Sequence, residues 1–554
     1  MLKTVCIDSL DQFAELESDW NALVASQPYS TIFLRHEWLY TWFEYFGKNR
    51  RLYVLQFQDG ERKVGFAPLM ISTRSWFGWT QRVVEFIGSP DSDYSDFVGE
   101  DRACIIEGTF AYISEHSGDW DQIQLTQLSD RSTSLNYLRQ SILPRFKGTC
   151  VATDTCYQYR YTSDPSDGSD VKLCTGRHFR KIGNFFDRRG GYELSRIDDL
   201  DHAHRTLGQI QLMHINRWCN TDFPSLFEDG SKIRFYHRIL ERFWPIGSIC
   251  LMELTNRDLP VAALLSFEYH GWIYHYTIAY NQLFDKRSPG RFFLALQSET
   301  LVRQGYDLDF SRGAGFHKEK IANATSVNFT ITIYRSRTRY MAALLYRGFK
   351  KTTIVQRLLH AESVQHAKNR FLLNLRRYGL IGLVVRLLRR LVRSSVDRPP
   401  LELYLATAKP DTAAESSVLT VVTCSQLDNI ATVLGVPGES PAYEQLTARL
   451  ARAEICFAMG DMRLPEAIAW IDADVEALKR LGFKRELRND ERLVSSIWVS
   501  PLHDRRDVTL RLLVSIVSRL HREDKRLLVA AESNDRPMLQ ALQEAGFQLR
   551  PPSN

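Results

Sequence analysis

The central part of the chain, residues 271–320, shows the clearest pattern of apolar and polar positions. Aromatic and β-branched residues from Trp272 to Tyr280 predict a strand, and apolar residues at helical spacing predict a helix from Arg291 to Gln304. Gly305 is typical of a helix end, and a second strand is expected over 306–310. This succession of strand, turn, helix and strand indicates an α/β fold.

The turn between the first strand and the helix ends in Ser288, Pro289 and Gly290. Such a loop presents unpaired backbone N–H groups at the positive end of the helix dipole, which suits an anionic group such as a pyrophosphate. Arg287 and Arg291 add positive charge there. In the alternative interpretation, the Pro-Gly pair only makes the connection and the basic side chains are solvated.

The first part of the chain, residues 1–161, begins with an amphipathic helix pattern over Asp11–Leu23 and a second helix within 33–46. Two strands around the Asp-Gly pair at 59–60 follow, which is a strong hairpin signal. A further strand is expected over 121–128. This part is predicted to be one α/β module.

The next part, residues 162–345, repeats that order of elements. A basic stretch around Arg180 and a long helix over His202–Cys219 precede two strands around a polar turn at 256–258. The second strand carries small apolar residues, as its counterpart in the first part does. Two copies of one α/β module are the simplest account.

An acidic segment follows an apolar strand in the first module. It contains Asp91, Asp93, Tyr94 and Asp96 within a few residues. The segment is either a polar turn or a loop that faces a substrate.

Three further segments complete the chain. Residues 346–398 are rich in Lys and Arg with an apolar face, and predict a basic amphipathic helical segment for an anionic membrane surface. The alternatives are packing on the protein itself and, least favoured because stacking aromatics are scarce, nucleic acid. Residues 399–417 are expected to be a linker, and residues 418–554 a compact α/β domain.

Length and composition narrow the class of protein. A chain of 554 residues exceeds one ordinary core, and 44% apolar and 25% charged residues are typical of soluble globular proteins. The sequence lacks a long apolar run and an apolar leader, so we expect a cytoplasmic protein, with peripheral association at the inner membrane through 346–398. The nine cysteines are scattered without a CxxC pair, and we therefore expect no zinc or other metal site.

The central stretch and the C-terminal domain resemble the GNAT N-acetyltransferase superfamily. In the C-terminal domain, Asn534 and the Gly546-Phe547 pair match an Asn before the last helix and the closing Gly-Phe of that superfamily. The resemblance implies tandem GNAT-like mixed sheets flanked by helices, plus a third GNAT-like domain. It also implies that the turn after the central strand holds the pyrophosphate of acyl-CoA.

The first two modules together resemble the CelD-like (BioF-like) acyltransferase family, a tandem GNAT arrangement related to Fem-type transferases. The matching pieces are FLRHEWLYTWFEYFG, FAPLM, DSDYSDFV, SPG and the set Asp309, Phe310, Gly313, His317 and Lys318. His317 stands where the family usually has Tyr. The resemblance extends from about residue 11 to residue 334.

This resemblance implies transfer of an acyl group, most simply acetyl from acetyl-CoA, to an amine. Such a reaction needs a base, donors to the oxyanion and an acid for the leaving thiolate. Glu268 and Asp309 are the base candidates, and His317, Tyr280 and Lys318 are the acid or orienting candidates. The expected acyl-CoA residues are Tyr276, Arg287, Ser288, Gly290 and Arg291, and the expected substrate residues are Asp93, Tyr94 and Asp96.

The C-terminal domain departs from the GNAT pattern in its turn at 503–507, which lacks glycine and contains Asp504 and Asp507. These carboxylates would repel a pyrophosphate, so we expect a degenerate, noncatalytic copy.

Three hypotheses follow for the whole chain. The first is an acyl-CoA N-acyltransferase acting on an amine-bearing small molecule or glycolipid precursor of the envelope or exopolysaccharide. The second is a Fem-like transferase that uses aminoacyl-tRNA, and the third is a noncatalytic scaffold.

Overall fold

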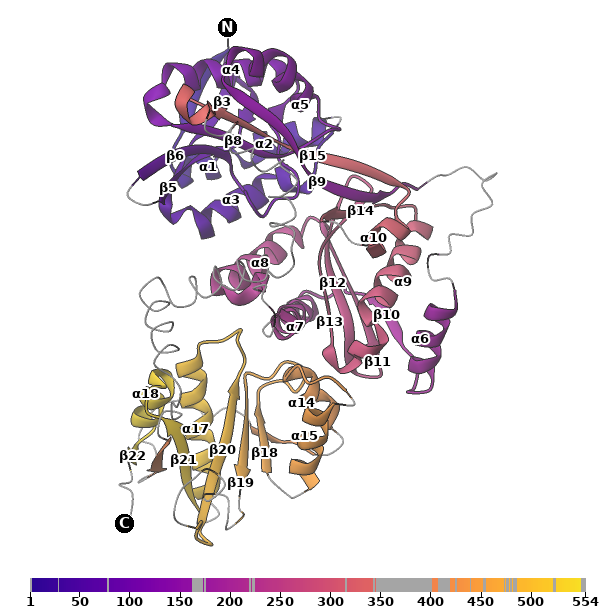
Figure 1. Ribbon diagram of the computed structural model, residues 1–554, viewed down its shortest axis with the longest axis vertical. Helices are drawn as coiled ribbons and strands as arrows, with labels where there is room; N and C mark the ends of the chain where they lie inside the picture. The colour runs from indigo at the N-terminus through magenta and orange to yellow at the C-terminus, as the bar shows by residue number, and fades with distance from the viewer. Residues whose placement is uncertain are drawn as a thin grey trace.

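The computed structural model describes residues 2–27, 29–76, 79–161, 173, 176–218, 221, 225–313, 316–341, 344, 401–406, 419–423, 426–438, 440–451, 455–472, 474, 478, 481, 486–521 and 525–549. Three lobes follow one another: the first module at the top of Figure 1, the second in the middle and the C-terminal domain at the bottom. The predicted basic segment 346–398 lies outside the described residues.

The first module places an aromatic core under its helices. Trp38 and Trp42, on the aromatic face of the predicted second helix, are buried there together with Trp20 of the preceding helix. The helices and strands are β1 (Lys3–Ile7), α1 (Leu10–Ala14), α2 (Glu17–Ser26), α3 (His36–Phe46), β2 (Arg50–Leu52), β3 (Val54–Asp59), β4 (Arg62–Ala67), β5 (Leu69–Trp76), β6 (Trp79–Phe86), β7 (Val98–Gly99), α4 (Arg102–Glu115), β8 (Gln122–Ser129), α5 (Thr133–Tyr137) and β9 (Gly148–Tyr159).

One helix prediction in this module needs correction. The pattern over 11–23 predicts one helix, whereas the structure has α1 and α2 with a break between them. The N–H of Leu16 bonds to the carbonyl of Phe13 at 3.1 Å. This tighter bond interrupts the α-helical ladder.

The second module contributes most of the residues of the candidate site described below. Its elements are α6 (Arg177–Asp187), β10 (Glu193–Arg196), α7 (Leu200–Trp218), η7 (Leu226–Glu228), α8 (Gly230–Phe243), β11 (Ile249–Asn256), β12 (Leu259–Tyr269), β13 (Trp272–Tyr280), η8 (Gln282–Arg287), α9 (Pro289–Arg303), β14 (Asp307–Arg312), α10 (Phe316–Ile321) and β15 (Ala324–Tyr334). The predicted central order of strand, turn, helix and strand is thus β13, η8, α9 and β14.

The two modules share one mixed sheet of eleven strands, in the order β10-β11-β12-β13-β14-β9-β15-β8-β6-β5-β2. A separate four-stranded sheet has the order β1-β3-β4-β7. In the large sheet, β15 of the second module lies between β9 and β8 of the first, and β9 pairs with β14. Figure 1 shows β15 running from the middle lobe into the upper one. The modules therefore exchange strands, and the predicted α/β fold with mixed sheets is confirmed.

The C-terminal domain forms a seven-stranded sheet with the order β17-β18-β19-β20-β21-β16-β22. Its elements are β16 (Leu401–Ala406), β17 (Leu419–Val421), α14 (Leu427–Val433), α15 (Pro441–Ala451), β18 (Ile455–Met459), β19 (Ala467–Asp472), β20 (Glu491–Val499), α17 (Arg505–His521), β21 (Arg526–Glu532), α18 (Arg536–Glu544) and β22 (Phe547–Leu549). The stretch 399–417, predicted as linker, includes β16, which pairs with β21 and β22. Within the described part of the chain, no helix is both long and apolar enough to cross a membrane.

Candidate functional site

The two central strands of the second module part from each other. β13 and β14 run parallel, but their pairing covers only Trp272–Tyr274 against Asp307–Asp309. Beyond Tyr274, β13 continues to pair with β12, as far as Tyr280 opposite Ala262. A cavity of about 490 Å³ lies between the diverging ends and is lined by residues of both strands. This volume is typical of small-molecule sites, and the freed edge of β13 offers backbone groups to a ligand.

A β-bulge lies at the point where the strands part. His275 pairs with Ser266 and Thr277 with Leu265, which leaves Tyr276 as an extra residue in β13. Bulges redirect side chains and are common beside active sites. The Tyr276 hydroxyl lies 2.7 Å from the Tyr236 hydroxyl of α8. Burial raises the pKa of Tyr276 well above its ordinary value, so this phenol stays protonated.

The first turn of α9 lines the same cavity. Ser288 adopts a left-handed conformation, φ 52° and ψ 51°, and its side chain makes no capping hydrogen bond. Pro289 occupies the first helical position, where a missing N–H costs little. A Cβ on Gly290 would lie 3.0 Å from Cδ1 of Tyr280, so the close approach to this ring favours glycine. Together with Arg291, these residues direct the positive end of the helix dipole at the cavity.

A second positive charge comes from α7. The guanidinium of Arg217 lies 4.7 Å from the centroid of the Tyr280 ring, a cation–π contact. The Tyr280 hydroxyl donates to Oδ1 of Asp285 at 3.0 Å. All three residues line the cavity. Arg217 has no carboxylate partner among the residues that the structure describes, so its charge is open to an anionic ligand.

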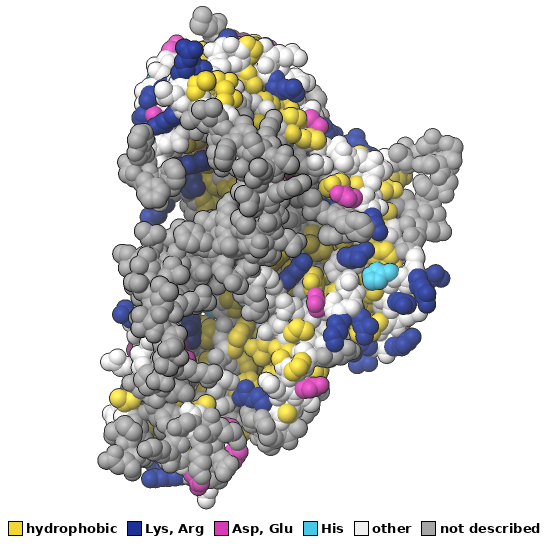
Figure 2. All heavy atoms as spheres, viewed as in Figure 1, with side chains coloured by type: hydrophobic (Ala, Val, Ile, Leu, Met, Phe, Trp, Pro, Cys, Tyr) yellow, Lys and Arg dark blue, Asp and Glu magenta, His cyan; other side chains and the backbone are white. Residues whose placement is uncertain are grey.

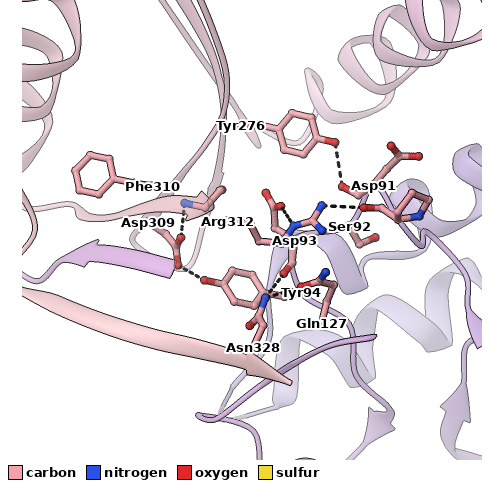
Figure 3. A network of polar contacts seen from close by, with 12 residues as sticks. Asp91, Ser92, Asp93, Tyr94, Gln127, Tyr276, Asp309, Phe310, Arg312 and Asn328 are labelled. Carbon is pink, nitrogen blue, oxygen red and sulfur yellow. Dashed lines mark hydrogen bonds and ion pairs between the residues drawn. The ribbon is translucent and has the colours of Figure 1, made fainter. Parts of the chain in front are cut away.

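The acidic segment of the first module reaches the cavity from the opposite side. Asp91 and Asp93 line it together with Arg312 at the end of β14. Arg312 Nε donates to Asp93 Oδ1 at 2.6 Å. The Asp91 carboxylate accepts from Trp42 Nε1 at 2.7 Å and pairs with Lys232. Figure 3 shows Asp93 and Arg312 facing each other, with Tyr276 beside the backbone of Asp91.

Lys318 of α10 holds the end of β14 in place. Its Nζ donates to the carbonyl of Phe310 at 2.6 Å and to that of Arg312 at 2.9 Å. Burial lowers the pKa of Lys318, which makes its neutral form more accessible. The residue also lines the cavity, and its role as an acid or orienting group stays a prediction.

Asp309 lies outside the cavity, in a buried network that links the two modules (Figure 3). Its carboxylate accepts hydrogen bonds from the Tyr94 hydroxyl at 2.6 Å, from Gln158 Nε2 at 2.8 Å and from the N–H of Ser311 at 2.8 Å. Burial raises the pKa of Asp309. Neither Asp309 nor Tyr94 is among the residues that line the cavity.

Glu268 and Asp96 are also away from the cavity. Glu268 pairs with Ile273 across β12 and β13, between the bulge and the hairpin turn, where β13 still pairs with β14 and away from the diverging strand ends. Its carboxylate binds Arg196 at 2.6 Å. Asp96 forms an ion pair with Arg102 at 3.3 Å, and both side chains are buried.

Arg287 faces the C-terminal domain instead of the main cavity. Its guanidinium lies 4.6 Å from the centroid of the Phe185 ring. It lines a smaller cavity of about 100 Å³ together with Asp428 and Tyr443. The side chain of His317 lies outside the described residues.

The C-terminal domain repeats the arrangement of the central strands. β19 and β20 pair with a bulge after Trp470, and β20 runs parallel to β21 over Glu491–Val494. The helix that follows β20 differs from α9, because Asp504 Oδ1 accepts the N–H of Asp507 at 2.9 Å. Arg505 at its first position is paired with Asp535. The domain thus has the same strand arrangement as the second module. The first turn of its α17, unlike that of α9, is capped by the Asp504 carboxylate.

The comparisons with known proteins agree with this geometry. Residues 177–319 match the model of the acetyltransferase (GNAT) domain. No curated protein matches the chain. Solved structures similar to it include FemX, with 10% identity over 61% of this chain and 99% of that chain and a TM-score of 0.40. A tandem GNAT protein from the clavulanic acid biosynthesis pathway has 9% identity over 60% and 98%, with a TM-score of 0.34.

The matched residues run from the start of α6 into α10 and include both diverging strands. The chain therefore contains a GNAT-type acetyltransferase domain, and the protein is an acyltransferase. The solved structures are too distant to transfer an activity from one protein to the other.

Sequence reasoning placed Asp91 in the acidic segment but missed four other titratable residues that the cavity brings together: Arg217, His275, Asp285 and Arg312. Arg312 immediately precedes Gly313 of the predicted set and could have been included with it. Arg217 is one cation in a long helix, and nothing in its neighbourhood distinguishes it. Among the described residues, no group of three side chains is suited to hold a metal ion.

Proposed function

We propose that the protein transfers an acyl group from acyl-CoA to an amine, with the acyl donor between the diverging ends of β13 and β14. The observation that carries this proposal is the position of the cavity. It lies where the parallel strands stop pairing and beside the first turn of α9, which has no side-chain cap. A diphosphate at this turn would place a pantetheine arm along the free edge of β13.

In the proposed reaction, the amine nitrogen attacks the thioester carbonyl carbon and the carbon–sulfur bond breaks. Backbone N–H groups near the bulge would stabilise the oxyanion. Asp91 and Asp93 lie on the side from which an ammonium group would approach, and a carboxylate there would accept its proton. Tyr280 and Lys318 are the candidates that return a proton to the thiolate.

The acceptor belongs to the same proposal. From the resemblance to CelD-like proteins, we propose an amine of an envelope or exopolysaccharide precursor, reached at the inner membrane surface. The basic segment that would contact this surface lies outside the described residues.

Calorimetric titration with acetyl-CoA tests the proposed donor. We expect the intact protein to bind, and the variant Gly290→Asp/Arg291→Glu to bind at least about 100-fold more weakly. The new carboxylates would oppose the helix dipole, and a side chain at position 290 would meet the Tyr280 ring. A factor of 100 corresponds to about 2.7 kcal/mol.

A matched control carries the same change of charge elsewhere. In Gly118→Asp/Arg62→Glu, the Arg62 side chain is 70% exposed and a Cβ at Gly118 meets no atom within 4 Å. This control should bind acetyl-CoA as the intact protein does. Failure of the intact protein to bind acetyl-CoA or longer acyl-CoA would contradict the proposal.

A second candidate donor, aminoacyl-tRNA, is favoured by the charge around α6. Arg177, Arg180, Lys181 and Arg188 are exposed and have no ion-pair partner among the described residues. Figure 2 shows Lys and Arg side chains gathered on the right-hand side, where α6 lies in Figure 1. Binding of aminoacyl-tRNA in a salt-sensitive manner, without binding of acyl-CoA, would replace the first candidate by the second.

A further inference from the structure

The C-terminal domain contacts the second module directly behind the cavity. Asn281, the residue after Tyr280, is 1% exposed. Its Nδ2 donates to Oγ1 of Thr432 in α14 at 2.8 Å and to the carbonyl of Pro260 at 2.8 Å. Its Oδ1 accepts the N–H of Leu283 at 2.9 Å, which begins η8. One side chain thus joins the end of β13, the loop toward α9 and the C-terminal domain.

The next residue of α14 makes a matching contact with α7. The carbonyl of Val433 accepts a hydrogen bond from Nδ2 of Asn216 at 3.0 Å. The carbonyl of Asn216 accepts from Nε2 of Gln282 at 3.1 Å. Asn216 immediately precedes Arg217, whose guanidinium lies over the Tyr280 ring in the cavity.

The last turn of α14 therefore contacts Asn216 and Asn281, which lie next to Arg217 and Tyr280 in the chain. Tyr280 in turn packs against Gly290 at the first turn of α9. A third contact supports the same loop, because the N–H of Gly438 donates to the carbonyl of Leu283 at 3.2 Å.

We propose that the C-terminal domain is a positioning element of the acyl-donor site. Thr432 and Val433 hold Asn281 and Asn216, and thereby fix Tyr280, Arg217 and the loop that leads to the first turn of α9. This inference rests on the proposed function for the meaning of the site, although the contacts themselves do not depend on it. It gives the third domain a role that requires no ligand of its own.

The physical reason is the short and buried connection between the two domains. Asn281 is nearly inaccessible to solvent, so loss of the Thr432 hydroxyl leaves one of its donors without a partner. The Asn281 carboxamide is then held by one hydrogen bond fewer. The N–H of Leu283, which donates to this carboxamide, becomes more mobile. Thr432 itself does not line the cavity, so its substitution loosens the loop between β13 and α9 without replacing any residue of the cavity.

Hydrogen exchange of the full chain without ligand tests the positioning role. Thr432→Val should raise the exchange rate of amides 282–291 by about fivefold, the factor equivalent to one hydrogen bond of about 1 kcal/mol. Thr432→Ser keeps the hydroxyl and should restore the original rate. Gly438→Ala, whose Cβ would lie 2.5 Å from the carbonyl of Leu283, should also raise it. This second variant decides the question if Thr432→Val does not fold.

Thr509→Val is the matched control. Thr509 is a buried threonine of the same domain whose hydroxyl also bonds to a carbonyl four residues earlier, at 2.6 Å, as that of Thr432 does at 2.7 Å. Loss of Thr509 should leave the exchange of 282–291 unchanged. Equal exchange of these amides in Thr432→Val and Thr509→Val would overturn the inference.

Acetyl-CoA titration of the same variants separates the two proposals. If the intact protein binds, Thr432→Val should bind about fivefold more weakly, and Thr432→Ser and Thr509→Val should bind normally. Unchanged affinity in Thr432→Val would overturn the inference and leave the proposed function standing. If the intact protein binds no acyl-CoA, the proposed function fails, and hydrogen exchange alone decides the positioning role.

Discussion

Lowering the pH from 7 to 5 is expected to remove about 7 kcal/mol from the free energy of unfolding of the two modules. Four histidines cause this loss, of which His36 and His275 are buried and His214 and His237 are half-buried. Burial lowers the pKa of His36, His214 and His237 to about 4, and that of His275 to about 3. An imidazole in an unfolded chain has a pKa of about 6.5.

The sign of the effect follows from these pKa values. Between the folded and the unfolded pKa, the unfolded chain binds more protons than the folded chain, so stability falls as the pH falls. Each of the four histidines accounts for a loss of somewhat less than about 2 kcal/mol between pH 7 and pH 5. The total is comparable to the whole stability of many domains, and the protein should be close to unfolding at pH 5.

Urea denaturation at pH 7 and pH 5, followed by circular dichroism, measures this loss. His36→Gln keeps a donor toward the carbonyl of Phe13, which His36 Nε2 contacts at 2.8 Å, and should reduce the acid loss by about a quarter. His178→Gln, a change at an exposed position of α6, is the control and should not alter it. An equal stability of the intact protein at both pH values would contradict the account.

Asp309→Ala is expected to cost about 4 kcal/mol of stability. The substitution leaves the Tyr94 hydroxyl, the amide of Gln158 and the N–H of Ser311 without their acceptor, and all are buried. Loss of the buried carboxylate offsets part of this cost, because its burial is itself unfavourable.

The matched control for this prediction is Asp307→Ala, on the same strand. Asp307 is half-buried and its ion pair with Arg160, at 3.5 Å, is largely solvated. The control should cost less than about 1 kcal/mol. Thermal unfolding of both variants gives the comparison. Equal losses would show that Asp309 does not anchor the contact between the modules.

Local patterns in the sequence predicted the elements around the site well. The aromatic run, the Ser-Pro-Gly turn and the helical spacing correspond to β13, the start of α9 and its buried face. One cavity is lined by Lys318, Tyr276, Tyr280, Ser288, Gly290, Arg291 and Asp93, and their roles in a reaction stay predictions. These features are encoded within a few consecutive residues, where periodicity and turn chemistry act directly.

Features that depend on distant pairing could not be predicted in the same way. Its place at the end of a strand makes Glu268 a base candidate, but the hairpin register puts it on the side of the bulge away from the diverging strand ends. Asp309 was chosen as a base, whereas burial and three donors make it part of the junction between modules. The insertion of β15 between β8 and β9 joins segments about 170 or more residues apart, a contact that local pattern does not reveal.

A crystal structure of the protein with bound CoA tests the central claim most directly. We expect the diphosphate at the first turn of α9, near Arg217 and Arg291, and the pantetheine arm along the free edge of β13. CoA at the start of α17 in the C-terminal domain, or at any place away from the diverging ends of β13 and β14, would contradict the account.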